Sequence, residues 1–473
     1  MSKDPFLNYL SERPLIRKVL PNTFWLLANR IVQLLVNVFL SAWMARYLGP
    51  SDMGIFNYAL VIIGIFSVFS FLGLDSIIIR DITQKIVPSN KSTQENEINN
   101  GISKESNTIL GTAFVLKLVG GFVVIALSSI FTYYKITTNP QLEFILLPII
   151  IILSSRYILS SFDVIDFWYQ SKVASKYVVI ARSIAFLVMS ALKILIILSS
   201  KSLIYFAIIL FIETVIATVL LIIQFRLSKQ KILFWKYDKS CAKYLLLQGL
   251  PLLISAIFVA IYSRIDQLVI GDLLTPQDLG IYGVSIKLSE IWLFVPSAIL
   301  SSVVPSLILA KKTDKNLYWR RIQNILDVLV WISIFASIFF TVAGGFIIKV
   351  LFGDEYMTAL PALKLITWNG VFIVTGMIFS EYNVIENKTK VTILQTIVGL
   401  LIGYVCSVIL IPKVGIVGGA ISMIIAQSIS GFILPVFFTH SRGLFISFIR
   451  AFDIFRIIKN FYYLYVKLRY KRK

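Results

Sequence analysis

Residues 49–56 read Gly-Pro-Ser-Asp-Met-Gly-Ile-Phe, and residues 275–282 read Thr-Pro-Gln-Asp-Leu-Gly-Ile-Tyr. The two segments share a proline, an aspartate two positions later, a Gly-Ile pair and an aromatic residue, at an offset of 226. Each segment follows one long apolar stretch and begins the next. A turn with a helix N-cap would explain either copy alone, but agreement in both sequence and position indicates an internal repeat.

The sequence around the repeats is typical of a membrane protein. The 473 residues are 58% hydrophobic, with a mean hydropathy of +0.85, whereas soluble domains are roughly 45–50% apolar. A transmembrane helix needs about 20 apolar residues, so about twelve helices would occupy about half of this chain. We expect transmembrane segments at 21–46, 54–77, 107–132, 141–162, 178–199, 202–225, 246–271, 280–310, 322–350, 361–384, 391–411 and 415–438.

The net charge of +21 reflects membrane orientation and does not indicate nucleic-acid binding. Of the 45 lysines and arginines, 32 fall in segments on the side of the N-terminus, 5 in the opposite turns and 8 within the segments themselves. Short cytoplasmic loops carry such an excess of basic residues. The distribution predicts that both termini are cytoplasmic.

Six segments separate the repeated turns, so both halves enter the membrane in the same direction. This predicts parallel repeats about an axis along the membrane normal, with a cavity between them. The predicted fold is an all-α polytopic membrane protein with two six-helix lobes around a central cavity. The basic, aromatic-rich tail is predicted to be an amphipathic helix on the membrane surface. The predicted divisions are a cytoplasmic N-terminus 1–20, an N-lobe 21–225, a linker 226–245, a C-lobe 246–438 and a cytoplasmic tail 439–473.

Polar residues inside the predicted transmembrane segments are the candidates for cargo binding, because charge within a membrane normally faces a cavity or a partner. Asn29, Gln33 and Asn37 share one helical face, with Arg30 beside them. The remaining candidates are Arg264, Asp266, Gln267, Lys117 and Lys287. A cationic cavity suits an anionic cargo, and arginine binds phosphate oxygens in a bidentate manner. Mutual ion pairing and snorkelling to the interface are the structural alternative.

Acidic residues suggest where a coupling ion could bind. Asp75, Glu213 and Asp266 are the candidates. Asp163 and Asp166 end the fourth predicted segment, and we expect them to be solvated interfacial carboxylates more than a metal site. No phosphate-binding loop indicates an ATP-driven motor, and the two distant cysteines form no metal motif. We therefore expect no metal, no cofactor and no enzymatic activity.

Two segments, residues 45–56 and residues 264–271 with the turn that follows, resemble bacterial polysaccharide flippases of the Wzx type. These flippases belong to the MOP (multidrug, oligosaccharidyl-lipid, polysaccharide) exporter superfamily. The resemblance covers the whole chain and implies a MATE-like fold. It also implies translocation of undecaprenyl-pyrophosphate-linked oligosaccharide across the bacterial inner membrane, by alternating access, for O-antigen, capsule or exopolysaccharide synthesis. Arg30 and Arg264 would then lie in the cationic cavity. The implied partners are the lipid-linked cargo, membrane lipids and the polysaccharide polymerase or chain-length machinery, without nucleic acid.

Two other functions remain open from the sequence. A cation-coupled multidrug antiporter of the same superfamily would favour an acidic cavity, whereas the intramembrane charges here are mainly basic. A membrane-bound polymerase or ligase would need a large outer loop, and all of the predicted outer turns are short.

Overall fold

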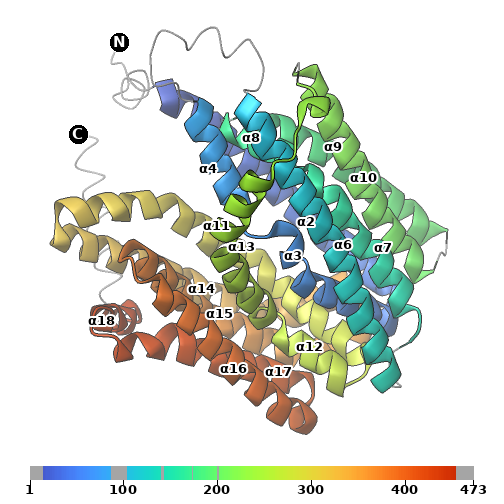
Figure 1. Ribbon diagram of the computed structural model, residues 1–473. Helices are drawn as coiled ribbons and strands as arrows, with labels where there is room; N and C mark the ends of the chain where they lie inside the picture. The colour runs from blue at the N-terminus through green and yellow to red at the C-terminus, as the bar shows by residue number, and fades with distance from the viewer. Residues whose placement is uncertain are drawn as a thin grey trace, which may run out of the picture. The chain divides into compact units, whose positions relative to one another are not determined.

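The computed structural model describes residues 14–86, 104–139, 143–172, 174–199, 202–228 and 230–453, although not the side chains of 14–31, 85–86 and 104. The chain forms two compact units, one drawn from Met1–Leu48 and Ile55–Ala260 and the other from Gly49–Gly54 and Ile261–Lys473. The described residues contain helices and connecting turns but no strand (Figure 1). The predicted lobe boundaries stay a prediction.

The first unit is built from α2(Pro14–Phe66, apart from residues 49–54), α3(Val68–Phe71), α4(Asp75–Ile86), α6(Lys104–Thr138), α7(Leu146–Leu159), α8(Val164–Ser171), α9(Lys176–Leu198), α10(Leu203–Leu227) and most of α11(Lys239–Tyr262). Two of its predicted transmembrane segments contain breaks. The first break lies at Leu72 and Gly73, both in the left-handed region with φ of 53° and 66°. The second is the 3-10 turn η1(Ser160–Asp163) between α7 and α8. A hydrogen bond of 2.8 Å joins Ser70 Oγ to Ser160 Oγ, so the two breaks lie side by side.

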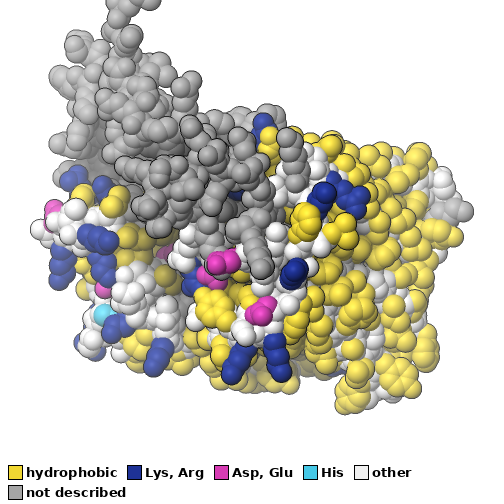
Figure 2. Space-filling view, turned by 45° about the horizontal axis from the view of Figure 1, so that its top comes forward, with side chains coloured by type: hydrophobic (Ala, Val, Ile, Leu, Met, Phe, Trp, Pro, Cys, Tyr) yellow, Lys and Arg dark blue, Asp and Glu magenta, His cyan; other side chains and the backbone are white. Residues whose placement is uncertain are grey.

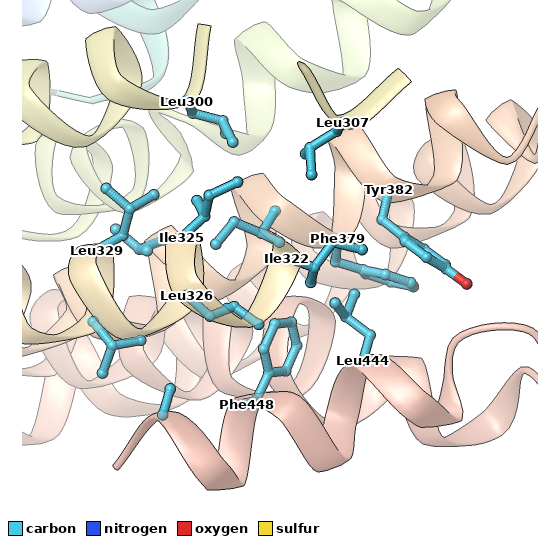
Figure 3. Close-up of a cluster of buried hydrophobic side chains, with 14 of the residues drawn as sticks. Leu300, Leu307, Ile322, Ile325, Leu326, Leu329, Phe379, Tyr382, Leu444 and Phe448 are labelled. Atoms are coloured by element: carbon cyan, nitrogen blue, oxygen red, sulfur yellow. The ribbon is translucent and has the colours of Figure 1, made fainter. Parts of the chain in front are cut away.

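The second unit contains α12(Ile265–Leu273), α13(Pro276–Thr313), α14(Lys315–Leu351), α15(Leu360–Ile385), α16(Thr389–Val414), α17(Ile416–Gln427) and α18(Arg442–Ala451). The short turns η3(Asp354–Ala359), η4(Ser428–Ile433) and η5(Leu434–Phe437) connect or extend these helices. Its core combines side chains from α13, α14, α15 and α18 (Figure 3). Leu444 and Phe448 of α18 are fully buried, while Arg450 of the same helix is exposed. This helix is the described part of the predicted amphipathic tail, and residues 454–473 lie outside the described part.

Within the described residues, eleven helices are long and apolar enough to cross a membrane. The first, Val32–Gln84, has 53 residues, enough for two crossings, and bends at Gly49, whose φ is 75°. Large apolar side chains stay exposed, such as Val342 at 81% and Phe335 at 74%. Figure 2 shows hydrophobic side chains over an extended part of the visible surface, with lysines and arginines gathered elsewhere on it. Lipid rather than water suits such a surface, and the chain is a multi-pass membrane protein, as the sequence predicted.

The two copies of the repeated turn contact each other through their glycines, inside the second unit. A Cβ atom added to Gly54 would lie 1.7 Å from the Pro276 carbonyl oxygen, and one added to Gly280 would lie 1.9 Å from the Pro50 oxygen. The contact is reciprocal, as expected for related repeats, and it leaves no room for a side chain at either glycine. Thr275 and Asp278 form a capping box at the start of α13, which confirms the predicted N-cap in the second copy.

Candidate functional site

Arg264 lies at a break between two helices. The helix α11 ends at Tyr262, and Arg264 is the N-cap residue of α12, with a backbone conformation outside the helical region. The first peptide N–H groups of a helix carry partial positive charge and have no partner inside the helix. The break therefore concentrates positive potential beside a half-buried guanidinium.

Asp266 and Gln267 follow Arg264, and both residues are buried, with exposed fractions of 1% and 8%. The Tyr282 hydroxyl donates a hydrogen bond of 2.6 Å to Asp266 Oδ2. Among the described residues, Asp266 Oδ1 has no hydrogen-bond partner. α12 packs against α13, α16 and α17, so this carboxyl group is enclosed on several sides. An ionised carboxylate is costly in such surroundings unless a cation compensates it.

Lys117 lies inside the first unit and is fully buried. Its Nζ atom is 3.4 Å from Asp75 Oδ1, and it lies 5.3 Å from the ring centre of Phe71 and 4.8 Å from that of Phe167. Ring faces attract a cation electrostatically. The positive charge of Lys117 is therefore compensated within the unit in this conformation.

Asp163 and Asp166 differ from the expectation of solvated carboxylates. Arg182 Nη2 is 2.9 Å from Asp163 Oδ1 and 3.0 Å from Asp166 Oδ2. The Gln170 amide donates to Asp166 Oδ1 at 3.0 Å, and the Asp166 side chain is only 10% exposed. The two carboxylates are not at the end of the fourth transmembrane helix as predicted, because α8 continues this helix to Ser171 and places both of them inside it.

The other predicted site residues are dispersed. Glu213 forms an ion pair of 3.2 Å with Lys193. On α2, Gln33 is half-buried and Asn37 is exposed, and on α13 Lys287 is half-buried. Asn29 and Arg30 belong to α2, but their side chains lie outside the described part.

The structure thus unites Lys117 with Asp75 in the first unit and places Arg264 next to Asp266 and Gln267 in the second. Sequence reasoning missed Tyr282 as the partner of Asp266, and it missed the bridge from Arg182 to two aspartates. The Arg182 bridge could have been predicted from the sequence, because a short connection between neighbouring helices brings their adjoining ends together.

Comparison with known proteins identifies the class. A family model described as "Polysaccharide biosynthesis protein" matches residues 19–309, more than half of the chain. A MATE family multidrug resistance transporter of the MOP superfamily, in an inward-facing conformation, has a similar structure. Its TM-score is 0.70 at 12% identity, covering 89% of this chain and 96% of that one. The lipid II flippase MurJ in an inward closed conformation gives a TM-score of 0.66 at 14% identity, covering 91% of each chain.

The fold is therefore that of the MOP superfamily transporters, as the resemblance implied. This chain belongs to the polysaccharide biosynthesis protein family. It is also similar to the capsular polysaccharide biosynthesis protein CapF of Staphylococcus aureus, with 22% identity over 384 residues, which cover 80% of this chain and 89% of CapF. The predicted resemblance to polysaccharide flippases of this superfamily is confirmed.

Proposed function

We propose that this protein flips undecaprenyl-pyrophosphate-linked oligosaccharide repeat units across the bacterial inner membrane during synthesis of a surface polysaccharide. The observation that carries the proposal is the match to a polysaccharide biosynthesis family over residues 19–309, in a chain with a transporter fold. The proposed activity is translocation and not catalysis. The proposed orientation has both termini in the cytoplasm, where the polymer's lipid-linked units are loaded.

Arg264 is the proposed contact for the pyrophosphate group of the cargo. It combines a guanidinium, which matches phosphate oxygens in a bidentate manner, with a position at the N-terminus of α12, where the helix dipole favours an anion. Arg30, Asn29, Gln33, Asn37, Lys287 and Gln267 remain proposed cavity residues. Lys117 is proposed as a cargo contact only for a conformation that separates it from Asp75, because it is fully buried here.

Asp266 is the proposed coupling carboxylate of the second unit. Glu213 and Asp75, the other two candidates, each form an ion pair with a lysine, whereas Asp266 forms no ion pair within the described part of the chain and its Oδ1 has no hydrogen-bond partner there. Binding of a proton or a monovalent cation would remove the cost of an isolated buried charge.

The test is a deletion strain of the bacterium that carries this gene. Surface polysaccharide would be quantified, and lipid-linked repeat units would be extracted and assigned to a membrane leaflet. We expect complete units to accumulate on the cytoplasmic side and to be released when the gene is restored. Normal surface polymer without trapped units would refute the proposal, and changed drug susceptibility would then favour a multidrug antiporter.

Arg264→Ala and Arg264→Lys in the restored gene test the contact to the cargo. We expect Arg264→Ala to lower polymer production most, and Arg264→Lys to restore part of it because a lysine keeps the charge but not the bidentate geometry. Lys349→Ala is the matched control, because it removes a positive charge from an exposed pair with Asp354. Equal production by all three variants at equal protein levels would exclude this role for Arg264.

The polymerase or chain-length machinery that would receive the cargo is likewise a proposed partner.

A further inference from the structure

Five charged side chains from four transmembrane helices form one cluster inside the first unit. Arg182, Lys117, Asp166 and Asp75 all lie within electrostatic reach of Asp163. Lys117 is associated with Asp75, and Arg182 bridges Asp163 and Asp166. The cluster therefore contains three carboxyl groups and two basic groups, and the surplus acid belongs to the pair that shares Arg182.

The cluster lies on helices whose neighbouring positions form an apolar core of the unit, with the Asp75 and Arg182 side chains 46% and 43% exposed. Lys172 and Lys176 mark the membrane interface at the end of these helices, because each places its ammonium group over an aromatic ring, Trp168 and Tyr177 respectively. Asp163 precedes Lys172 by nine residues, which corresponds to about 14 Å along a helix. Arg182 follows Lys176 by six residues, or about 9 Å. An uncompensated negative charge at this depth is costly.

A metal ion does not explain the surplus charge. Within the described residues, no three acidic, histidine or cysteine side chains come close enough together to hold one. A proton on one of the two carboxyl groups that share Arg182 would neutralise the cluster without a metal ion. Two carboxyl groups around one guanidinium resemble other paired acids, in which one member takes up a proton because both cannot ionise at low cost.

The hydrogen bonds indicate which carboxyl group carries the proton. Both oxygens of Asp166 accept a hydrogen bond or ion pair, from Gln170 and Arg182. Asp163 uses only Oδ1, which contacts Arg182, and its Oδ2 receives no donor from the described residues. Asp163 also lies at the break between η1 and α8, and its side chain is 26% exposed against 10% for Asp166. A proton thus has both a vacant oxygen and a route of access at Asp163.

We propose that Asp163 is a proton-binding site, held by Arg182 and Asp166, and that the transport cycle loads and releases this proton. The coupling part of the proposal rests on the proposed flippase function, whereas the protonation itself does not. Protonation converts the Asp163 carboxylate to a carboxylic acid and leaves the ion pair between Arg182 and Asp166 intact. Loss of the proton restores the surplus charge and weakens the packing of α8 against α9, so proton binding would favour the conformation described here.

Infrared difference spectroscopy on the purified, full-length protein in lipid vesicles tests the protonation without any cargo. The C=O stretching band of a carboxylic acid disappears on ionisation, so its amplitude counts protonated acids. We expect the wild type at neutral pH to show a component of this band, separate from any contribution of Asp266, that is lost in Asp163→Asn. It should also be lost in Asp166→Asn, because Asp163 alone with Arg182 then ionises. Arg182→Gln should increase the band, since both acids then lose their cation.

Glu213→Gln is the matched control, because Glu213 has its own basic partner and needs no proton. Elution as a single monodisperse species on size exclusion shows that each variant is folded. A band that is as large in both Asp163→Asn and Asp166→Asn as in the wild type overturns the site, as does a band that Glu213→Gln decreases.

The coupling is tested separately by surface polymer production from the Asp163→Asn variant in the deletion strain. Asparagine imitates the protonated acid in size and charge, so the variant should fold but be unable to release a proton. We expect at least a tenfold loss of polymer, since the cycle would stop in one state. Wild-type production with the expected infrared pattern would overturn the coupling while leaving the proton site in place. Normal polymer in the deletion strain itself would instead refute the flippase function.

Discussion

The reciprocal glycine contact makes a sharp prediction for Gly280→Ala. Gly280 lies in the helix α13, where alanine would ordinarily gain about 1 kcal/mol over glycine. The new Cβ atom, however, would lie 1.9 Å from the Pro50 carbonyl oxygen. Because the atom it meets belongs to the backbone, no side-chain rotation relieves the clash. The two backbones must separate by at least about 1 Å, which places the cost at the upper end of overpacking, about 3 kcal/mol.

The matched control is Gly403→Ala in α16, another buried helical glycine. Its Cβ atom would meet Ala426 and Ile265 at 3.5 Å, an ordinary van der Waals distance. The control keeps the gain in helix propensity without the clash, so the two variants should differ by about 3 kcal/mol. Thermal unfolding in detergent, followed by tryptophan fluorescence, should show Gly280→Ala below wild type and Gly403→Ala at or above it. A separation on the order of 5 °C is expected.

The double variant gives a second check on the same contact. Gly54→Ala alone should destabilise as Gly280→Ala does, because its Cβ atom would lie 1.7 Å from the Pro276 oxygen. Once one substitution has separated the backbones, the other meets less resistance, so the two effects should not add. Full additivity, or a Gly280→Ala protein as stable as the control, would show that these backbones are not held together.

Three further predictions concern polar and charged groups. Tyr282→Phe removes the hydroxyl that donates to Asp266, and we expect a loss of about 1.5–3 kcal/mol in the free energy of unfolding; an unchanged denaturation midpoint would contradict this hydrogen bond. A double-mutant cycle with Lys117→Met and Asp75→Asn should give a coupling of only about 0.5–1 kcal/mol, because the Asp75 side chain is 46% exposed. His440 is the single histidine of the chain and lies beyond the last transmembrane helix. Partial burial lowers its pKa most, the positive charge of Lys388 lowers it further, and the negative charge of Glu386 partly opposes both. Its neutral form is therefore favoured by folding, so stability should be full above the ordinary histidine pKa of about 6.5 and fall as the pH drops below it. His440→Gln should remove this dependence, and a variant that keeps the wild-type pH profile would refute the assignment.

The amino-acid sequence by itself determined the class of fold and the repeat. Runs of apolar residues must form helices in lipid, because the backbone groups have no water to bond, and this holds regardless of how the helices pack. The repeated Pro-x-Asp-x-Gly-Ile turn follows the same logic, since proline, a capping acid and glycine act on the backbone next to them. Local chemistry was enough to predict an N-cap at this turn, which the structure shows as a capping box between Thr275 and Asp278.

Only the tertiary structure decided which charges compensate each other and which glycines touch. Asp163 and Asp166 look like interfacial acids along the chain, but Arg182 from the next helix joins them into one ion-paired group. Tyr282 of α13 donates to Asp266 of the preceding helix α12, and Gly54 meets Pro276 although more than two hundred residues separate them. Hydropathy and local propensity depend on neighbours along the chain, whereas ion pairs and close packing depend on distances of a few ångströms between segments, which a linear pattern does not contain.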